Sequence, residues 1–105
     1  MPAKSRKEQI EELLRHDPND PELLYMLAME HVSAGNDADA VGCFKELMDR
    51  FPTYPPGYHQ GARALVRLNR NDEARAVLQK GIPAALAQNN QHAAGEMQEL
   101  LAGLE

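Results

Sequence analysis

Apolar residues recur every three or four positions along most of this chain, which is the spacing of one face of an α-helix. Short polar breaks rich in Pro, Gly, Asn and Asp interrupt this pattern. The pattern therefore predicts a succession of amphipathic helices. The expected helices cover residues 5–16, 21–34, 37–51, 56–68, 71–87 and 90–104.

Several of the breaks carry helix-start signals. Ser5 followed by Glu8 is a capping box, in which each residue satisfies a backbone N–H at the helix start. Asp20 is a suitable N-cap, and Pro21 fits the first helical position, where its missing N–H is not needed. Asn71 is expected to cap the fifth helix in the same way.

Composition supports an all-α chain and excludes several classes of function. Only 5% of the residues are aromatic, and Ala, Leu and Met dominate the apolar 43%. The chain carries 11 basic and 16 acidic residues, a net charge of −5, which argues against nucleic acid as a partner. No stretch approaches a membrane span and the first residues lack the apolar core of a signal peptide, so we expect no membrane partner and a cytoplasmic location.

The chain contains an internal repeat, because similar residues lie 34 positions apart. The strongest matches are Pro18 with Pro52, Pro21 with Pro55, Ala28 with Ala62, and Ala40 with Ala74. Small alanines at matched positions are expected where two helices cross closely, since a larger side chain would separate their axes. Phe44 and Leu78, also 34 apart, are expected to fill the space between repeats.

A helix–turn–helix unit with this period resembles the tetratricopeptide repeat (TPR) family. The resemblance implies an all-α, right-handed α–α superhelix, a TPR solenoid of two repeats with a capping helix at each end. This chain departs from the family pattern at several positions: Leu24 stands where Trp is usual, His31 where Tyr is usual, Gly61 where Leu is usual, and Gly81 where Ala is usual.

The same resemblance divides the chain. We expect a single domain, 1–105, with repeats at 21–54 and 55–88. The helices 5–16 and 90–104 flank these repeats. Since one repeat cannot bury its own apolar face, both flanking helices are interpreted as caps.

The resemblance also implies a concave groove lined by the first helix of each repeat. Tyr25 and Met29 share a helix face, as do His59, Arg63 and Arg67, so the groove is expected to be apolar on one side and cationic on the other. Such a groove suits a protein segment with apolar anchors and at least one carboxylate. The predicted groove residues are Tyr25, Met29, Val32, Ser33, His59, Arg63, Val66 and Arg67.

Other chemistries find little support. Some TPR co-chaperones bind a C-terminal carboxylate through Lys and Asn, but Tyr25 and Met29 stand at the corresponding positions here. The four histidines are scattered without the spacing of zinc ligands, and Cys43 is the only cysteine, so we expect no metal and no cofactor. No nucleophile motif or phosphate-binding loop is present, and we do not expect an enzyme.

Two functions follow from these expectations. The leading one is a non-catalytic adaptor or scaffold that binds a peptide or protein in the groove. The alternative is a structural module that forms a homodimer through an end helix, using the stripe Ile10, Leu13, Leu14 or the stripe Leu100, Leu101, Leu104. A third reading is a fragment of a longer TPR array.

Overall fold

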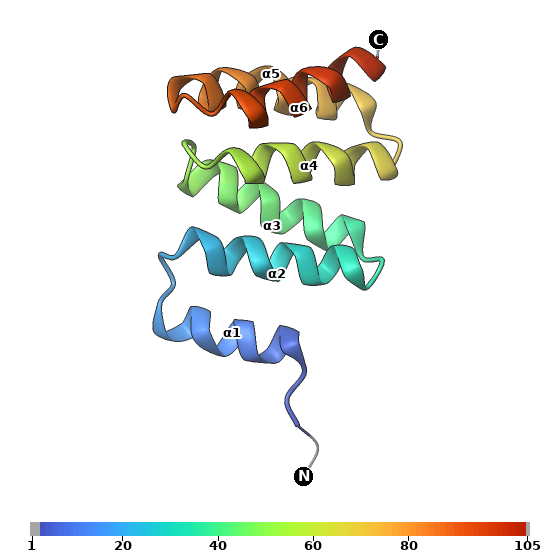
Figure 1. Ribbon diagram of the computed structural model, residues 1–105. Helices are drawn as coiled ribbons and strands as arrows, with labels where there is room; N and C mark the ends of the chain where they lie inside the picture. Colours follow the sequence, from blue (N-terminus) through green and yellow to red (C-terminus); the bar gives the residue numbers. More distant parts are fainter. Residues whose placement is uncertain (1–2, 105) are drawn as a thin grey trace.

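The computed structural model describes residues 3–104, so residues 1, 2 and 105 of the expected domain lie outside the described part. Within that part the chain forms six α-helices and no strand (Figure 1). The helices are α1 Arg6–His16, α2 Pro21–Ser33, α3 Asp37–Arg50, α4 Pro55–Arg67, α5 Asn71–Ala87 and α6 Gln91–Gly103.

Two helix starts follow the predicted caps. The Ser5 side chain accepts a hydrogen bond from the Glu8 backbone N–H at 3.1 Å. The Asp20 carboxylate accepts one from the Glu22 backbone N–H at 2.9 Å, and Pro21 takes the first helical position. These contacts satisfy N–H groups that have no partner within the helix.

The start of α5 differs from the prediction. Asn71 does not cap this helix but is its first residue, and Arg70 occupies the cap position without a side-chain cap bond. Asn69, the residue before Arg70, takes a left-handed conformation (φ 61°) and completes the turn between α4 and α5. The Arg70 guanidinium pairs with Glu73 in the first turn instead.

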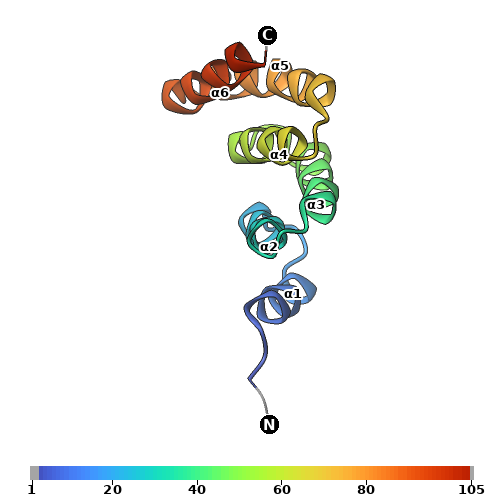
Figure 2. The same ribbon diagram turned by 90° about the vertical axis from the view of Figure 1, so that its right-hand side faces the viewer.

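The six helices stack in sequence into an elongated all-α solenoid with extents of 50 × 29 × 20 Å. Each helix contacts the next one in the chain, and α4 also contacts α2 and α6. Figure 2 shows α2, α4 and α6 in one row and α3 and α5 in the other. We call the surface formed by α2, α4 and α6 the inner face, and the side formed by α3 and α5 the outer face.

The repeated small residues lie where the sequence predicted. The four matched alanines are fully buried, as are Phe44 and Leu78. The Phe44 ring lies 6.3 Å from that of Tyr25 on α2, and a Cβ at Gly61 of α4 would lie 3.1 Å from the Phe44 Cβ. Phe44 therefore fills the space between the hairpin of α2 and α3 and the hairpin of α4 and α5. The four alanines are Ala28, Ala40, Ala62 and Ala74.

Gly81, one of the departures from the family pattern, lies at the tightest packing point. A Cβ at this position would lie 2.5 Å from the Cβ of Tyr58 and 2.8 Å from the Sδ of Met97. Real Cβ atoms do not approach so closely, so α5 can lie against both α4 and α6 only because residue 81 lacks a side chain.

The predicted stripe on α1 is only partly buried. Ile10 is buried and Leu14 packs on the core, but Leu13 remains 51% exposed. Because α1 contacts α2 alone, it covers a narrow face, and Leu13 falls outside that face. Leu13 is therefore the member of the stripe Ile10, Leu13, Leu14 that remains open to solvent.

Candidate functional site

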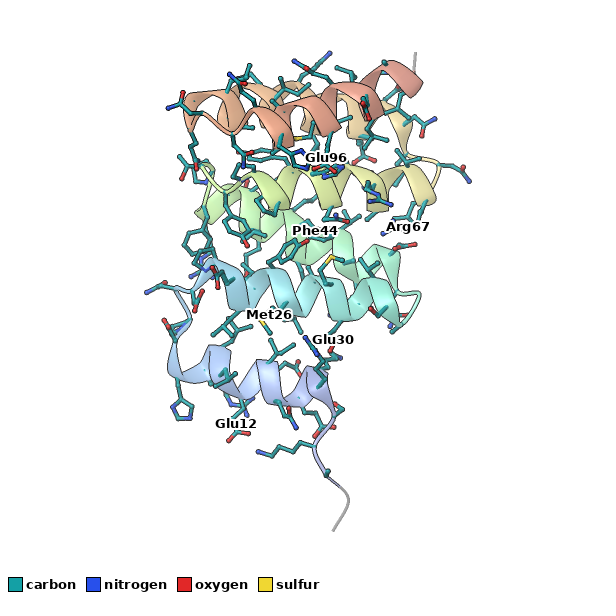
Figure 3. All side chains as sticks on the ribbon, in the orientation of Figure 1. Glu12, Met26, Glu30, Phe44, Arg67 and Glu96 are labelled. Atoms are coloured by element: carbon teal, nitrogen blue, oxygen red, sulfur yellow. The ribbon has the colours of Figure 1, made fainter. Side chains whose placement is uncertain are left out.

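The inner face contains two hollows. The first hollow, of about 360 Å³, lies between α1 and α2. Figure 3 shows Met26 and Glu30 on α2 turned toward α1, at this position. The volume is within the range of small binding pockets. The first hollow is lined by Arg6, Tyr25, Met26, Met29, Glu30 and Ser33.

Glu30 is the charged centre of the first hollow. Its side chain is 20% exposed, and its Oε1 lies 2.8 Å from the Nε of Arg6, whose side chain is 74% exposed. The Arg6 N–H does not point at that oxygen, which is buried and accepts no hydrogen bond from the described residues. Arg6 and Glu30 thus form an ion pair between α1 and α2 at the first hollow.

The second hollow, of about 310 Å³, lies between α4 and α6. Figure 3 shows Glu96 pointing from α6 toward α4. This placement brings a carboxylate to the same hollow as His59 and Arg63 of α4. The second hollow is lined by Tyr25, Pro55, Pro56, His59, Gln60, Arg63, Asn90, His92, Ala93 and Glu96.

Tyr25 lines both hollows and joins them into one surface. Its ring packs edge-on against Tyr54 at 6.0 Å and is tilted against Phe44 at 6.3 Å, so its position is fixed by the core. Burial raises the pKa of the Tyr25 hydroxyl above its ordinary value of 10.0, although Arg63 opposes this shift, so the hydroxyl is a donor at neutral pH.

The second hollow has a defined charge arrangement. Burial lowers the pKa of His59 below its ordinary value of 6.5, and Arg63 acts in the same direction while Glu96 opposes it. His59 is therefore neutral at physiological pH. The Nε2 of His92 lies 3.1 Å from Glu96, an ion pair that forms when His92 is protonated. Among the described residues, Arg63 has no ion-pair partner and remains available to an anion.

Five of the eight predicted groove residues line these hollows: Tyr25, Met29, Ser33, His59 and Arg63.

The other three have different surroundings. Val32 and Val66 are half-buried and pack against the core. The Nε of Arg67 lies 3.0 Å from the Oδ1 of Asp37 at the start of α3, and Figure 3 shows Arg67 at the end of α4. Arg67 thus links two helices and lines neither hollow.

The charge of the inner face also differs from the prediction. The sequence indicated an apolar side and a cationic side, but Glu30 faces Arg6 in the first hollow and Glu96 lies beside Arg63 in the second. Because the lining of each hollow contains one guanidinium and one carboxylate, the lining is balanced in charge rather than cationic. The end helices supply Arg6 and Glu96, whose roles the sequence reasoning missed.

A signal for α6 was present in the sequence. His92 and Glu96 are four residues apart and share a helix face, whereas Met97 and Leu101 point to the core. The sequence does not show that this polar face lies against α4, which follows only from the packing of α6 on α4.

Within residues 3–104 no three His, Cys, Asp or Glu side chains gather as a metal site requires. No helix in that range is long and apolar enough to cross a membrane.

The chain is similar to two solved structures of a tetratricopeptide repeat domain protein from Salinibacter ruber. The crystal structure is 30% identical, with a TM-score of 0.77, and the match covers 81% of this chain and 94% of that one. The solution structure is 32% identical, with a TM-score of 0.79, covering 84% and 89%.

A solution structure of a protein from Bordetella parapertussis has the same fold. It is 20% identical, with a TM-score of 0.82, and the match covers 97% of this chain and 89% of that one. No family model and no curated protein matches the sequence.

Proposed function

Because the chain belongs to the tetratricopeptide repeat family, we propose that it is a protein-interaction module that holds a segment of a partner protein on its inner face. The observation that carries this proposal is Tyr25, which joins the two hollows into one continuous surface. A half-buried aromatic ring that packs against Phe44 and Tyr54 and lines both hollows is a suitable anchor for a partner side chain.

The chemistry of the hollows narrows the partner segment. Arg63, without an ion-pair partner among the described residues, offers a charge-assisted hydrogen bond to a carboxylate. Met29 and Tyr25 offer apolar contact next to it. The Glu30 carboxylate, whose side chain is 20% exposed, offers a negative charge to a basic side chain. We therefore propose an extended segment with an apolar anchor, a carboxylate near Arg63 and a basic side chain near Glu30.

A comparative capture experiment tests this proposal. The full chain is immobilised as wild type, as Tyr25→Ala, as Arg63→Glu and as Arg67→Glu, and each is exposed to native lysate of the source cell. Arg67→Glu is the matched control, because it makes the same charge change on the same helix outside both hollows.

We expect the partners recovered by wild type to be lost with Tyr25→Ala and Arg63→Glu and retained with Arg67→Glu. Identical recovery by wild type and Arg63→Glu would remove the inner face as the binding site. Melting curves of all four proteins establish that each is folded before the comparison is made.

One observation favours self-association as a second candidate. Leu13 on α1 is 51% exposed and Leu86 on α5 is 48% exposed, so an apolar side chain remains uncovered near each end of the stack. A dimer through either residue gives a mass in light scattering that rises with concentration and returns to the monomer value with Leu13→Ser or Leu86→Ser. A constant monomer mass would contradict it.

The proposal assigns no catalytic residue, metal or cofactor, and neither nucleic acid nor membrane is a partner in it. We place the function in the cytoplasm, which fits the free thiol of Cys43.

A further inference from the structure

A third hollow, of about 450 Å³, lies on the outer face, away from both hollows of the proposed groove. The stacking explains why it exists. On the inner face α4 contacts both α2 and α6, whereas α3 and α5 make no direct backbone contact in the described residues. Figure 2 shows α3 and α5 as the two helices of the outer row, and residues of both helices line the hollow. We call this space the outer hollow.

Tyr58 of α4 closes the bottom of the outer hollow. Its side chain passes between the two outer helices, and its hydroxyl donates a hydrogen bond to the Pro52 carbonyl at 2.8 Å. Gly81 lets the Tyr58 Cβ lie against α5. The bottom is therefore a rigid aromatic surface and does not depend on a mobile side chain.

The walls are apolar and the rim is mainly cationic. Met48 of α3 and Val77 of α5 face the hollow from opposite sides and are half-buried. Lys45 and Lys80 stand on the rim with Asp49, which gives two cations and one anion. Lys80 has no ion-pair partner among the described residues, and the Lys45 Nζ is 3.8 Å from Glu73.

This local charge is opposite in sign to that of the whole chain, which is −5. The lining of each inner hollow carries one arginine and one carboxylate, whereas the lining of the outer hollow carries two lysines and one aspartate, so the outer hollow has the more positive lining. An acidic molecule is repelled by most of the protein and attracted here.

From these features we propose that the outer hollow is a second docking site, which takes a protein segment bearing one apolar side chain flanked by carboxylates. The apolar side chain enters between Met48 and Val77 and rests on Tyr58. The flanking carboxylates lie toward Lys45 and Lys80, away from Asp49. Since the site shares no residue with the inner hollows, the module can bind two segments at once.

The test uses nuclear magnetic resonance on the ¹⁵N-labelled full chain, titrated with the peptide acetyl-Asp-Glu-Leu-Glu-Asp-amide. We expect saturable shifts of the backbone amides of Lys45, Met48, Val77 and Lys80, with millimolar affinity. Two control peptides separate the contributions: one replaces the leucine with serine, and the other replaces the acids with their amides. Each is expected to bind about tenfold more weakly.

Two protein variants complete the test. Lys45→Glu with Lys80→Glu is expected to weaken binding of the acidic peptide at the outer hollow by about tenfold or more, and Arg67→Glu, which lines none of the hollows, is expected to leave that binding unchanged. Lys45→Gln with Lys80→Gln, which removes charge without reversing it, is expected to give an intermediate loss and covers the case in which charge reversal disturbs folding.

The proposal is overturned by shifts that are confined to the inner face, by outer-hollow shifts that never saturate, by equal binding of the serine peptide at the outer hollow, or by wild-type affinity there in the glutamate variant. Failure of this site leaves the inner-face proposal intact, because the capture variants Tyr25→Ala and Arg63→Glu test different residues.

Discussion

The two ends of the stack are built differently, although both are single amphipathic helices. At the C-terminal end, α6 contacts α5 and α4, and its Met97 is fully buried. The Arg75 guanidinium of α5 donates a hydrogen bond to the Leu104 carbonyl just past α6 at 2.8 Å. At the N-terminal end, α1 contacts α2 alone and fully buries only Ile10.

The two end helices therefore differ in role, although the sequence predicted that both are caps. In a stack where each helix contacts only its neighbours, stability is the sum of local interfaces. Loss of α6 removes two interfaces and one wall of the second hollow, whereas loss of α1 removes one interface and Arg6. We therefore describe α6 as part of the core and of the proposed binding surface, and α1 as a lightly attached cap.

The largest effect is expected from Met97→Ala. This change removes a fully buried side chain that packs against α5, and large-to-small core changes of this kind cost about 2–5 kcal/mol. Denaturant unfolding measures the loss of unfolding free energy. A loss well under 1 kcal/mol would show that α6 is no more integral to the core than α1.

The close approach at Gly81 is expected to give the next effect. Gly81→Ala places a Cβ against Tyr58 and Met97, and overpacking of a tight core costs about 1–3 kcal/mol. Gly42→Ala is the matched control, since a Cβ at that exposed position of α3 meets nothing within 4 Å. The control is expected to raise the unfolding free energy by about 0.5–1 kcal/mol, and stabilisation by both changes would contradict the packing described for α5.

A smaller effect is expected from Ile10→Ala. If α1 can detach alone, the cost is limited to the free energy of its docking on α2, so the global unfolding free energy falls by only about 1 kcal/mol. Hydrogen exchange is expected to show loss of protection in α1 only. Loss of protection through α3 or beyond would mean that the N-terminal end is as integral as the C-terminal end.

The smallest effect concerns pH. Because burial lowers the pKa of His59 in the folded state, the unfolded chain takes up this proton first. The contribution of His59 to stability is therefore full above pH 6.5, its ordinary pKa, and decreases as the pH falls below it. Melting curves between pH 7.5 and pH 5 are expected to show a weaker pH dependence for His59→Gln than for the non-titrating control Gln60→Ala, and equal dependence would contradict this role.

The repeat itself was predictable because it depends on local spacing. From the sequence alone, the matched pairs Ala28 with Ala62 and Ala40 with Ala74 predicted positions of close helix packing. All four side chains are buried in the structure. The start of α5 was missed by one residue, since the left-handed turn at Asn69 decided it.

The site was less predictable because it joins distant segments. Glu96 and Arg63 line the same hollow only because α6 packs against α4. Residue 81 must be a glycine only because Tyr58 and Met97 both lie against it. The pairing of Arg67 with Asp37, which makes Arg67 unavailable to the groove, likewise depends on the angle between α3 and α4.

The central claim is that the inner face binds a protein segment, and mapping an unbiased set of peptides tests it most directly. Peptides selected from a random library on the immobilised full chain are titrated against the ¹⁵N-labelled protein and against Arg63→Glu. We predict a class of peptides that shifts the amides of Tyr25, His59, Arg63 and Glu96 and no longer binds Arg63→Glu. If no selected peptide shifts these residues, or if all bind Arg63→Glu as well as wild type, the inner face is not the binding surface.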